Sequence, residues 1–173
     1  MPDWLPPLIE VSPWKEDTFD RLYEIFCRDI RNGRLNYLGN PVNIFNETSD
    51  GKENIFWHLT TRTDHTTVVP RRKQKFFGNR VDASPQRLPD LRRCERFNWI
   101  KAIIEHAVEP EVTNWDHLEA DGTEKTYLWM KKQNFVVIMK KFPNHNRRLV
   151  TSFYVDSQYT INKFEKKYEN RMK

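Results

Sequence analysis

The stretch from Ile55 to Arg62, Ile-Phe-Trp-His-Leu-Thr-Thr-Arg, concentrates side chains that could act on a phosphodiester. Its aromatic and β-branched residues predict a short strand, whose alternate side chains point to opposite faces. On that interpretation the face away from the core carries, in order, Phe56, His58, Thr60 and Arg62. An imidazole, a hydroxyl and a guanidinium in a row can move a proton, donate a hydrogen bond and hold a phosphate. The alternative role for His58 is a structural, hydrogen-bonded histidine.

A second charged group opens the central helix that we expect to begin after Pro89-Asp90, with an apolar stripe from Leu91 to Ala107. The first turns of this helix contain Arg92, Arg93, Glu95 and Arg96. Cations near a helix start oppose its macrodipole, and guanidinium groups bind phosphate bidentately. We therefore expect the arginines to hold a phosphate, and Glu95 to orient an arginine or to transfer a proton. Solvated arginines neutralised by nearby acids are the alternative.

Two further segments could contact a polyanion. The weakly periodic insertion 63–88 is rich in cations and includes Arg71, Arg72 and Lys73, with Phe76-Phe77 close by. Cations and rings in a long loop favour a flap that binds phosphates and bases, although a solvated insertion has the same composition. The last predicted strand, Arg148 to Val155, adds a hydroxyl at Thr151 and rings at Phe153 and Tyr154, which we expect to bind substrate.

The elements that must position these side chains predict an α+β fold. We expect an N-terminal helix, capped by Ser12, and a central helix packed on a small, mainly antiparallel sheet. The sheet should end in a three-stranded meander formed by residues 126–131, 135–140 and 148–155. Residues 1–11 are expected to form an extended lead, and residues 158–173 a short basic C-terminal helix. The whole chain, 1–173, is expected to be a single domain.

Composition narrows the possible functions. The 173 residues carry a formal net charge of +5, and the pI is about 9.2, which suggests a polyanionic partner. Cys27 and Cys94 have no CxxC or Cys/His neighbour, so we expect buried free thiols and no metal site. There is no secretory leader pattern and no apolar run long enough to span a membrane. We therefore expect a cytoplasmic protein without a membrane partner and without a cofactor.

The order of these pieces resembles the phage-associated branch of the barnase, EndoU, colicin and RelE-like (BECR) nuclease superfamily, over roughly Phe19 to Tyr168. The pieces that carry the resemblance are Phe56–Arg62, Pro89–Arg96, Tyr127–Trp129 and Leu149–Val155. By this resemblance His58 corresponds to the catalytic histidine of the family. Thr151 and Phe153 correspond to the hydroxyl-x-aromatic pair of the colicin D type.

The resemblance implies a metal-independent endoribonuclease of toxin type. Its implied partners are RNA, with tRNA as one candidate, and an antitoxin or immunity protein. The chain departs from the colicin D type in having Arg62 where that type has a lysine cluster. It also has Thr-x-Phe in place of Ser-x-Trp, and a longer insertion.

Other functions fit parts of the same sequence. A non-catalytic nucleic-acid-binding module would use the basic insertion and the C-terminal lysines but not His58. A phage- or defence-associated protein on a nuclease-like scaffold without activity is a further possibility. His58-x-Thr60 is half of the motif of 2H phosphoesterases, but no second copy of that motif occurs in the chain.

Overall fold

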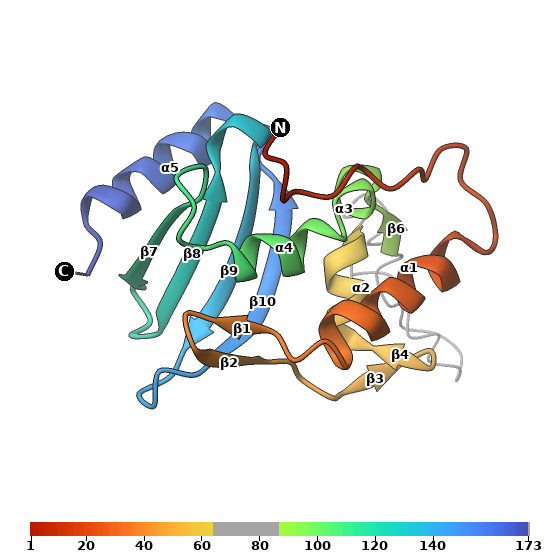
Figure 1. The fold of residues 1–173 in the computed structure, drawn as a ribbon, viewed down its shortest axis with the longest axis horizontal. Coiled ribbons are helices and arrows are strands. Elements are labelled where there is room, and N and C mark those ends of the chain that lie inside the picture. The colour runs from red at the N-terminus through yellow and green to blue at the C-terminus, as the bar shows by residue number, and fades with distance from the viewer. Residues whose placement is uncertain (64–86, 173) are drawn as a thin grey trace, which may run out of the picture.

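The computed structural model describes residues 1–63 and 87–172 as an α+β fold (Figure 1). The helices are α1 (Thr18–Phe26), which continues as the π-helical turn η1 (Cys27–Arg31), α2 (Asn54–Thr60), α3 (Leu91–Glu95), α4 (Trp99–Glu105), the 3-10 turn η4 (Lys131–Gln133) and α5 (Gln158–Glu169). The strands are β1 (Asn36–Tyr37), β2 (Asn40–Asn43), β3 (Thr48–Ser49), β4 (Lys52–Glu53), β5 (Thr61–Thr63), β6 (Arg87–Pro89), β7 (Thr113–Leu118), β8 (Glu124–Met130), β9 (Phe135–Lys141) and β10 (Arg147–Tyr154). The expected fold class and the C-terminal helix are confirmed.

The main sheet has the strand order β1-β2-β10-β9-β8-β7. Strands β7 to β10 pair antiparallel in sequence order, so the expected three-stranded meander is present and gains β7 as a fourth strand. Strand β2 runs parallel to β10 but pairs only with Arg147 and Arg148. From Leu149 onward, that side of β10 has no neighbouring strand among the described residues.

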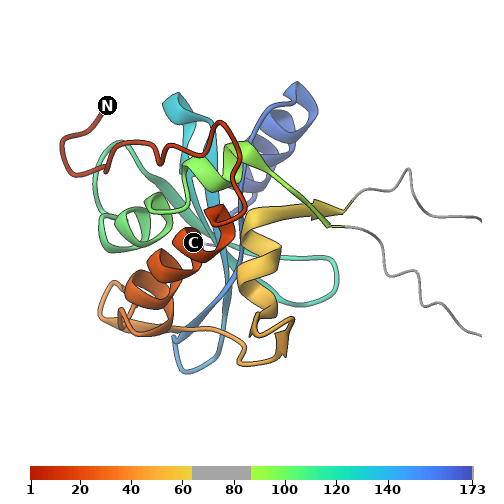
Figure 2. The same ribbon diagram turned by 90° about the vertical axis from the view of Figure 1, so that its right-hand side faces the viewer.

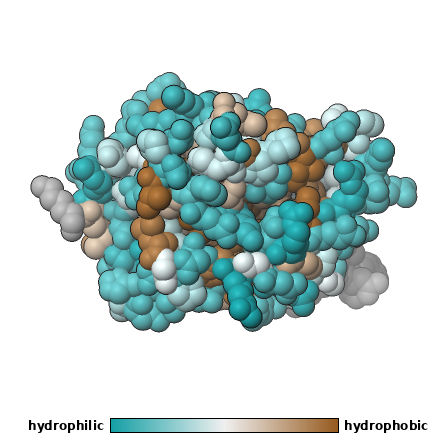
Figure 3. All heavy atoms as spheres, viewed as in Figure 1, coloured by the Kyte–Doolittle hydropathy of each residue, from teal (hydrophilic) through white to brown (hydrophobic). Residues whose placement is uncertain are grey.

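Two hydrophobic cores lie on opposite faces of this sheet. The larger core contains Phe135, Val137 and Met139 of β9 and packs under α1 and α4. The smaller core contains Val136 and Ile138 and packs under α5. Figure 2 shows α1 and α4 on one side of the sheet and α5 on the other. The apolar residues are largely enclosed, and the face seen in Figure 3 is mainly hydrophilic.

The prediction of a strand from Ile55 to Arg62 is wrong, because residues 54–60 form α2 and only Thr61 to Thr63 are extended. The buried residues of α2 are Ile55, Phe56, Leu59 and Thr60. This spacing follows the helical period of 3.6 residues rather than alternation. The proposed shared face of Phe56, His58, Thr60 and Arg62 therefore does not exist.

Packing around Phe56 explains the helix. The ring of Phe56 has edge contacts with those of Tyr23, Phe26 and Phe97, at centroid distances of 5.2, 5.6 and 6.0 Å. Tertiary contacts of this kind override the strand preference of β-branched and aromatic residues. The Thr60 hydroxyl donates to the Phe56 carbonyl at 2.9 Å, a hydrogen bond that spans one helical turn.

The expected helices have different bounds in the structure. The N-terminal helix begins at Thr18 rather than after Ser12, and Asp17 occupies its N-cap position. The central helix is broken between α3 and α4, at residues 96–98. The extended lead packs against this break. Its Ile9 amide donates to the Glu95 carbonyl at 2.8 Å, and its Pro6 carbonyl accepts from the Trp99 indole at 2.8 Å.

A register irregularity in β10 changes which of its side chains share a face. Leu149 pairs with Met139 on the side of the larger core, whereas Thr151 and Phe153 pair with Ile138 and Val136 on the α5 side. The shift lies between Leu149 and Thr151, as in a β-bulge. Regular alternation along the strand would place Leu149 on the same face as Thr151 and Phe153, and the irregularity places it on the opposite face.

We predict that Phe56→Ala destabilises the protein by about 3–5 kcal/mol, because the side chain is fully buried among other rings. Urea unfolding followed by tryptophan fluorescence would measure the loss. Leu118→Ala is the control, since Leu118 is 54% exposed and should change the free energy of unfolding by less than about 0.5 kcal/mol. Equal losses in the two variants would contradict the assignment of Phe56 to the core.

Candidate functional site

Helices α2 and α3 pack against β10, and the arginines of α3 reach Phe153 and Tyr154, where no described strand pairs with that edge of β10. Arg93 connects the three elements. Its Nη1 donates to the carbonyl of His58 at 2.8 Å, and its guanidinium lies 5.8 Å from the centroid of the Phe153 ring. Its Nε lies 3.3 Å from Oδ2 of Asp90. Burial lowers the pKa of the Arg93 guanidinium, and the carboxylate of Asp90 opposes this shift.

Asp90 sets the direction of α3. As predicted, it begins the helix, and its side chain accepts a hydrogen bond from the Arg93 amide at 3.2 Å. The carbonyl of Thr60 accepts from the Asp90 amide at 2.9 Å and from Sγ of Cys94 at 3.2 Å. These contacts attach the first turn of α3 to the end of α2. The arginines of that turn are thereby placed beside β10.

A pocket of about 440 Å³ lies between β5, the start of α3 and the end of β10. Its lining residues are Arg62, Pro89, Asp90, Leu91, Arg92, Tyr154 and Asp156. Three residues predicted from sequence, Arg62, Arg92 and Tyr154, are therefore brought together. Two guanidinium groups and an aromatic ring around one pocket can bind a phosphate and an adjoining planar group.

Two guanidinium groups lie over the ring of Tyr154. The Cζ atoms of Arg92 and Arg96 lie 4.5 and 4.7 Å from its centroid. Arg96 also donates to Oε2 of Glu95 at 3.0 Å, so the two neighbouring side chains are in direct contact. Arg92 is exposed, and it leaves donors available for an anionic ligand.

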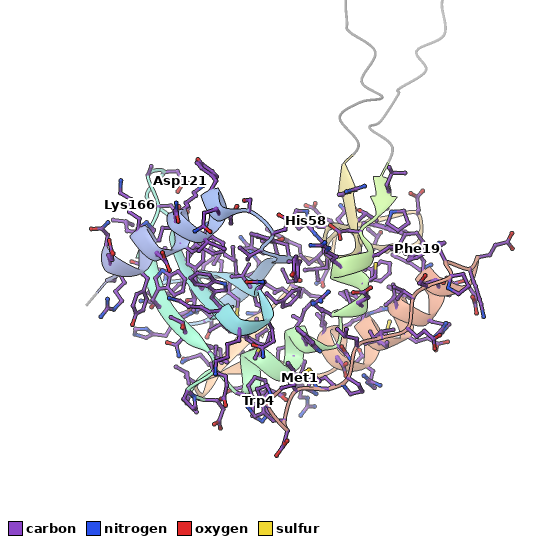
Figure 4. The ribbon with its side chains drawn as sticks, turned by 90° about the horizontal axis from the view of Figure 1, so that it is seen from above. Met1, Trp4, Phe19, His58, Asp121 and Lys166 are labelled. Atoms are coloured by element: carbon purple, nitrogen blue, oxygen red, sulfur yellow. The ribbon has the colours of Figure 1, made fainter. Side chains whose placement is uncertain are left out.

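His58 is exposed on α2, beside the pocket-forming elements. Figure 4 shows it on the side of the helices that faces the sheet. The hydrogen bond from Arg93 to its carbonyl fixes the backbone at this position. The imidazole thus belongs to the same part of the molecule as the arginines of α3.

Other residues predicted from sequence lie elsewhere. Thr60 is completely buried, and its hydroxyl is bonded within α2, so it cannot donate to a substrate. Thr151 and Phe153 lie on the α5 face of β10, opposite to Tyr154, which pairs with Phe135 of the larger core. Neither lines the pocket, although the Phe153 ring lies 5.8 Å from the Arg93 guanidinium. Arg71, Arg72 and Lys73, like most of the expected flap, lie outside the described residues.

Two carboxylates in the pocket wall were missed. The sequence places Asp90 at the start of the central helix but does not mark it as a pocket residue, and Asp156 is not among the predicted site residues. Asp156 follows the strand that carries Tyr154, so its position just after the end of β10 was the available signal. Its exposed carboxylate gives the pocket an acceptor beside the arginine donors.

Comparison with known proteins gives no relative: no family model, no curated protein and no solved structure matches the chain. Within residues 1–63 and 87–172, no helix is both long and apolar enough to cross a membrane. In the same ranges, no three His, Cys, Asp or Glu side chains are grouped so that they could hold a metal ion.

We predict that the thiol of Cys94 in the folded protein stays unreactive at pH values well above those at which a free thiol reacts. Burial raises its pKa from 9.0 to about 12, and only the thiolate is a good nucleophile. The folded state binds the thiol proton of Cys94 more tightly than the unfolded state does. The protonated thiol therefore contributes stability that is fully present below pH 9 and is lost as the pH approaches 12.

Iodoacetamide alkylation of a Cys27→Ser variant across this pH range would measure the reactivity of Cys94 alone. Urea-unfolded protein is the control and should react as the pH passes through 9. Equally fast alkylation of folded and unfolded protein would show that Cys94 is not enclosed between α2 and α3.

Proposed function

We propose that the protein is an endoribonuclease of toxin type, related to the BECR superfamily, which cuts RNA beside the open edge of β10. The observation that carries this proposal is the pocket in which Arg62 and Arg92 meet at Tyr154, next to the helix that presents His58. RNA, tRNA included, is the proposed substrate class. An antitoxin or immunity protein is the proposed partner.

The proposed reaction uses the nucleophile that RNA itself supplies. The 2′-oxygen attacks the adjacent phosphorus and loses its proton to a base, while the bond from phosphorus to the 5′-oxygen breaks. The departing oxygen receives a proton from an acid. The products are a 2′,3′-cyclic phosphate and a free 5′-hydroxyl.

His58 is the proposed acid or base, because an imidazole can take either role near neutral pH. Arg62 and Arg92 would hold the phosphate and stabilise its developing charge. Arg96 and Glu95 would keep the ring of Tyr154 and the stacked Arg92 in place. Arg93 would act as a positioning residue, since its donors contact the His58 carbonyl and Asp90.

We expect His58→Asn to lower the rate of RNA cleavage by about 10²–10⁴-fold, the usual contribution of a positioned proton-transfer group. Cleavage of total RNA in excess EDTA would be followed on gels. His145→Asn is the matched control, because His145 is exposed in the turn between β9 and β10 and its φ of 66° suits asparagine.

Undiminished cleavage by His58→Asn would remove this residue from the mechanism. Loss of wild-type cleavage in EDTA would contradict a metal-independent reaction.

We predict that Arg92→Gln lowers kcat by about 10²–10³-fold, as removal of a donor to a developing oxyanion does. Arg171→Gln provides a matched control, because its guanidinium also stacks on a tyrosine, 4.4 Å from the centroid of Tyr168, but far along the chain in the C-terminal segment. Steady-state kinetics on a fluorogenic RNA would compare the two. Similar kcat values for the two variants would show that Arg92 does not contact the reacting phosphate.

The second candidate function is RNA binding without catalysis. It is favoured by the stacking of Arg92 and Arg96 on Tyr154, because guanidinium groups and a ring can bind RNA without a proton-transfer group. In this case the pocket would bind RNA without cutting it. Retention of labelled RNA by wild-type protein, with no cleavage over extended incubation, would favour this function over the nuclease.

A further inference from the structure

A row of cations crosses the main sheet at the end opposite to Tyr154. Lys125 of β8 pairs with Lys140 of β9, and Lys140 pairs with Arg148 of β10. Directly opposed residues share a face, and neighbouring strands lie about 4.8 Å apart. Like charges placed this way destabilise a sheet. The row therefore has an electrostatic cost that a bound polyanion would remove.

On the other face of the sheet, at the same end, acidic side chains neutralise the cations. There Lys141 contacts Asp116 at 2.9 Å and Glu124 at 3.2 Å, and Arg147 lies 3.5 Å from Asp116. By contrast, within the described part of the chain neither Lys140 nor Arg148 forms an ion pair.

The acids that face the row lie at its Lys125 end. Against burial, which raises it, hydrogen bonds from Lys167 and Tyr127 lower the pKa of Glu119, and hydrogen bonds from Thr123 lower that of Asp121; the charge of Lys125 adds a smaller lowering to both. The unbalanced positive charge is therefore centred on Lys140 and Arg148.

Aromatic rings flank these two cations. The Arg148 guanidinium lies 3.7 Å from the centroid of Phe45 and 5.0 Å from that of Phe142. The Lys140 ammonium lies 5.5 Å from Phe142. Phe45 is 50% exposed, so it retains ring surface on which a base can stack. We call Phe45, Lys140, Phe142 and Arg148 the Arg148 surface.

Hollows next to the Arg148 surface offer polar groups. One, of about 400 Å³, is lined by Asn43, Phe142, Pro143, Asn144 and Asn146. Another, of about 500 Å³, shares Asn43 and includes Arg34 and Asn46. Asparagine amides can donate to and accept from the edges of unpaired bases.

We propose that the Arg148 surface is a binding site for single-stranded nucleic acid, separate from the pocket at Tyr154. Alternating cations and rings match a strand whose phosphates and unstacked bases are both accessible, whereas a duplex hides its base faces. Tyr154 lies six positions beyond Arg148 along β10, or about 20 Å of strand. The binding does not depend on cleavage and would occur even if the proposed nuclease activity were absent.

The test measures fluorescence anisotropy of the full chain with a short labelled 2′-O-methyl oligouridine, which lacks the nucleophile for cleavage. We expect Phe45→Ala to weaken binding by about 5- to 100-fold, the range for loss of one stacking ring. Lys140→Gln should reduce the slope of log affinity against log salt by about 0.7, as expected for one lost phosphate contact.

Leu38→Ala and Lys101→Gln are the matched controls. Leu38 is 53% exposed, and Lys101 is a half-buried lysine of α4. Because the oligouridine cannot be cleaved, its binding is measured independently of the proposed nuclease activity. Absence of wild-type binding, or unchanged binding by both Phe45→Ala and Lys140→Gln, would overturn it, as would equal losses in the controls.

Discussion

The edge of β10 beyond Arg148, which has no partner strand among residues 1–63 and 87–172, is the constraint on which the arrangement of the site depends. Because β2 pairs with β10 only at Arg147 and Arg148, the backbone from Leu149 to Tyr154 needs another cover on that side. Exposed strand edges invite unwanted pairing, and proteins commonly cover them with helices. Here α2 and α3 provide the cover, and Arg93 joins them through the His58 carbonyl.

This cover explains why cations gather where they do. Helix α2 carries His58. Helix α3 and its C-cap residue place the guanidinium groups of Arg92 and Arg96 over the ring of Tyr154. At the other end of β10, cations on one face are balanced by Asp116 and Glu124, while those on the other face are not. At the Arg148 surface, positive charge thus exceeds what the described part of the fold neutralises, whereas in the pocket at Tyr154 the cations Arg62 and Arg92 face the carboxylates of Asp90 and Asp156.

The meander could be predicted from sequence because β8 to β10 combine apolar runs with clear turns. The helix at residues 54–60 could not, because Ile-Phe-Trp favours a strand locally and only the surrounding rings make Phe56 a helical core residue. Arg92 and Arg96 were found by residue type and by their position after Asp90, whereas Arg62 was predicted from a strand face that does not exist. The faces of Thr151 and Phe153 depended on a register shift, which no sequence pattern marks.

The central claim is that RNA is cut beside the open edge of β10 by its own 2′-hydroxyl. Mass spectrometry of the ends of cleaved RNA tests this claim most directly, because the chemistry of attack determines the end groups. The account predicts 2′,3′-cyclic phosphates on one set of fragments and free 5′-hydroxyls on the other. Fragments that end in a 3′-hydroxyl and a 5′-phosphate would contradict it, since water rather than the 2′-oxygen would then have attacked the phosphorus.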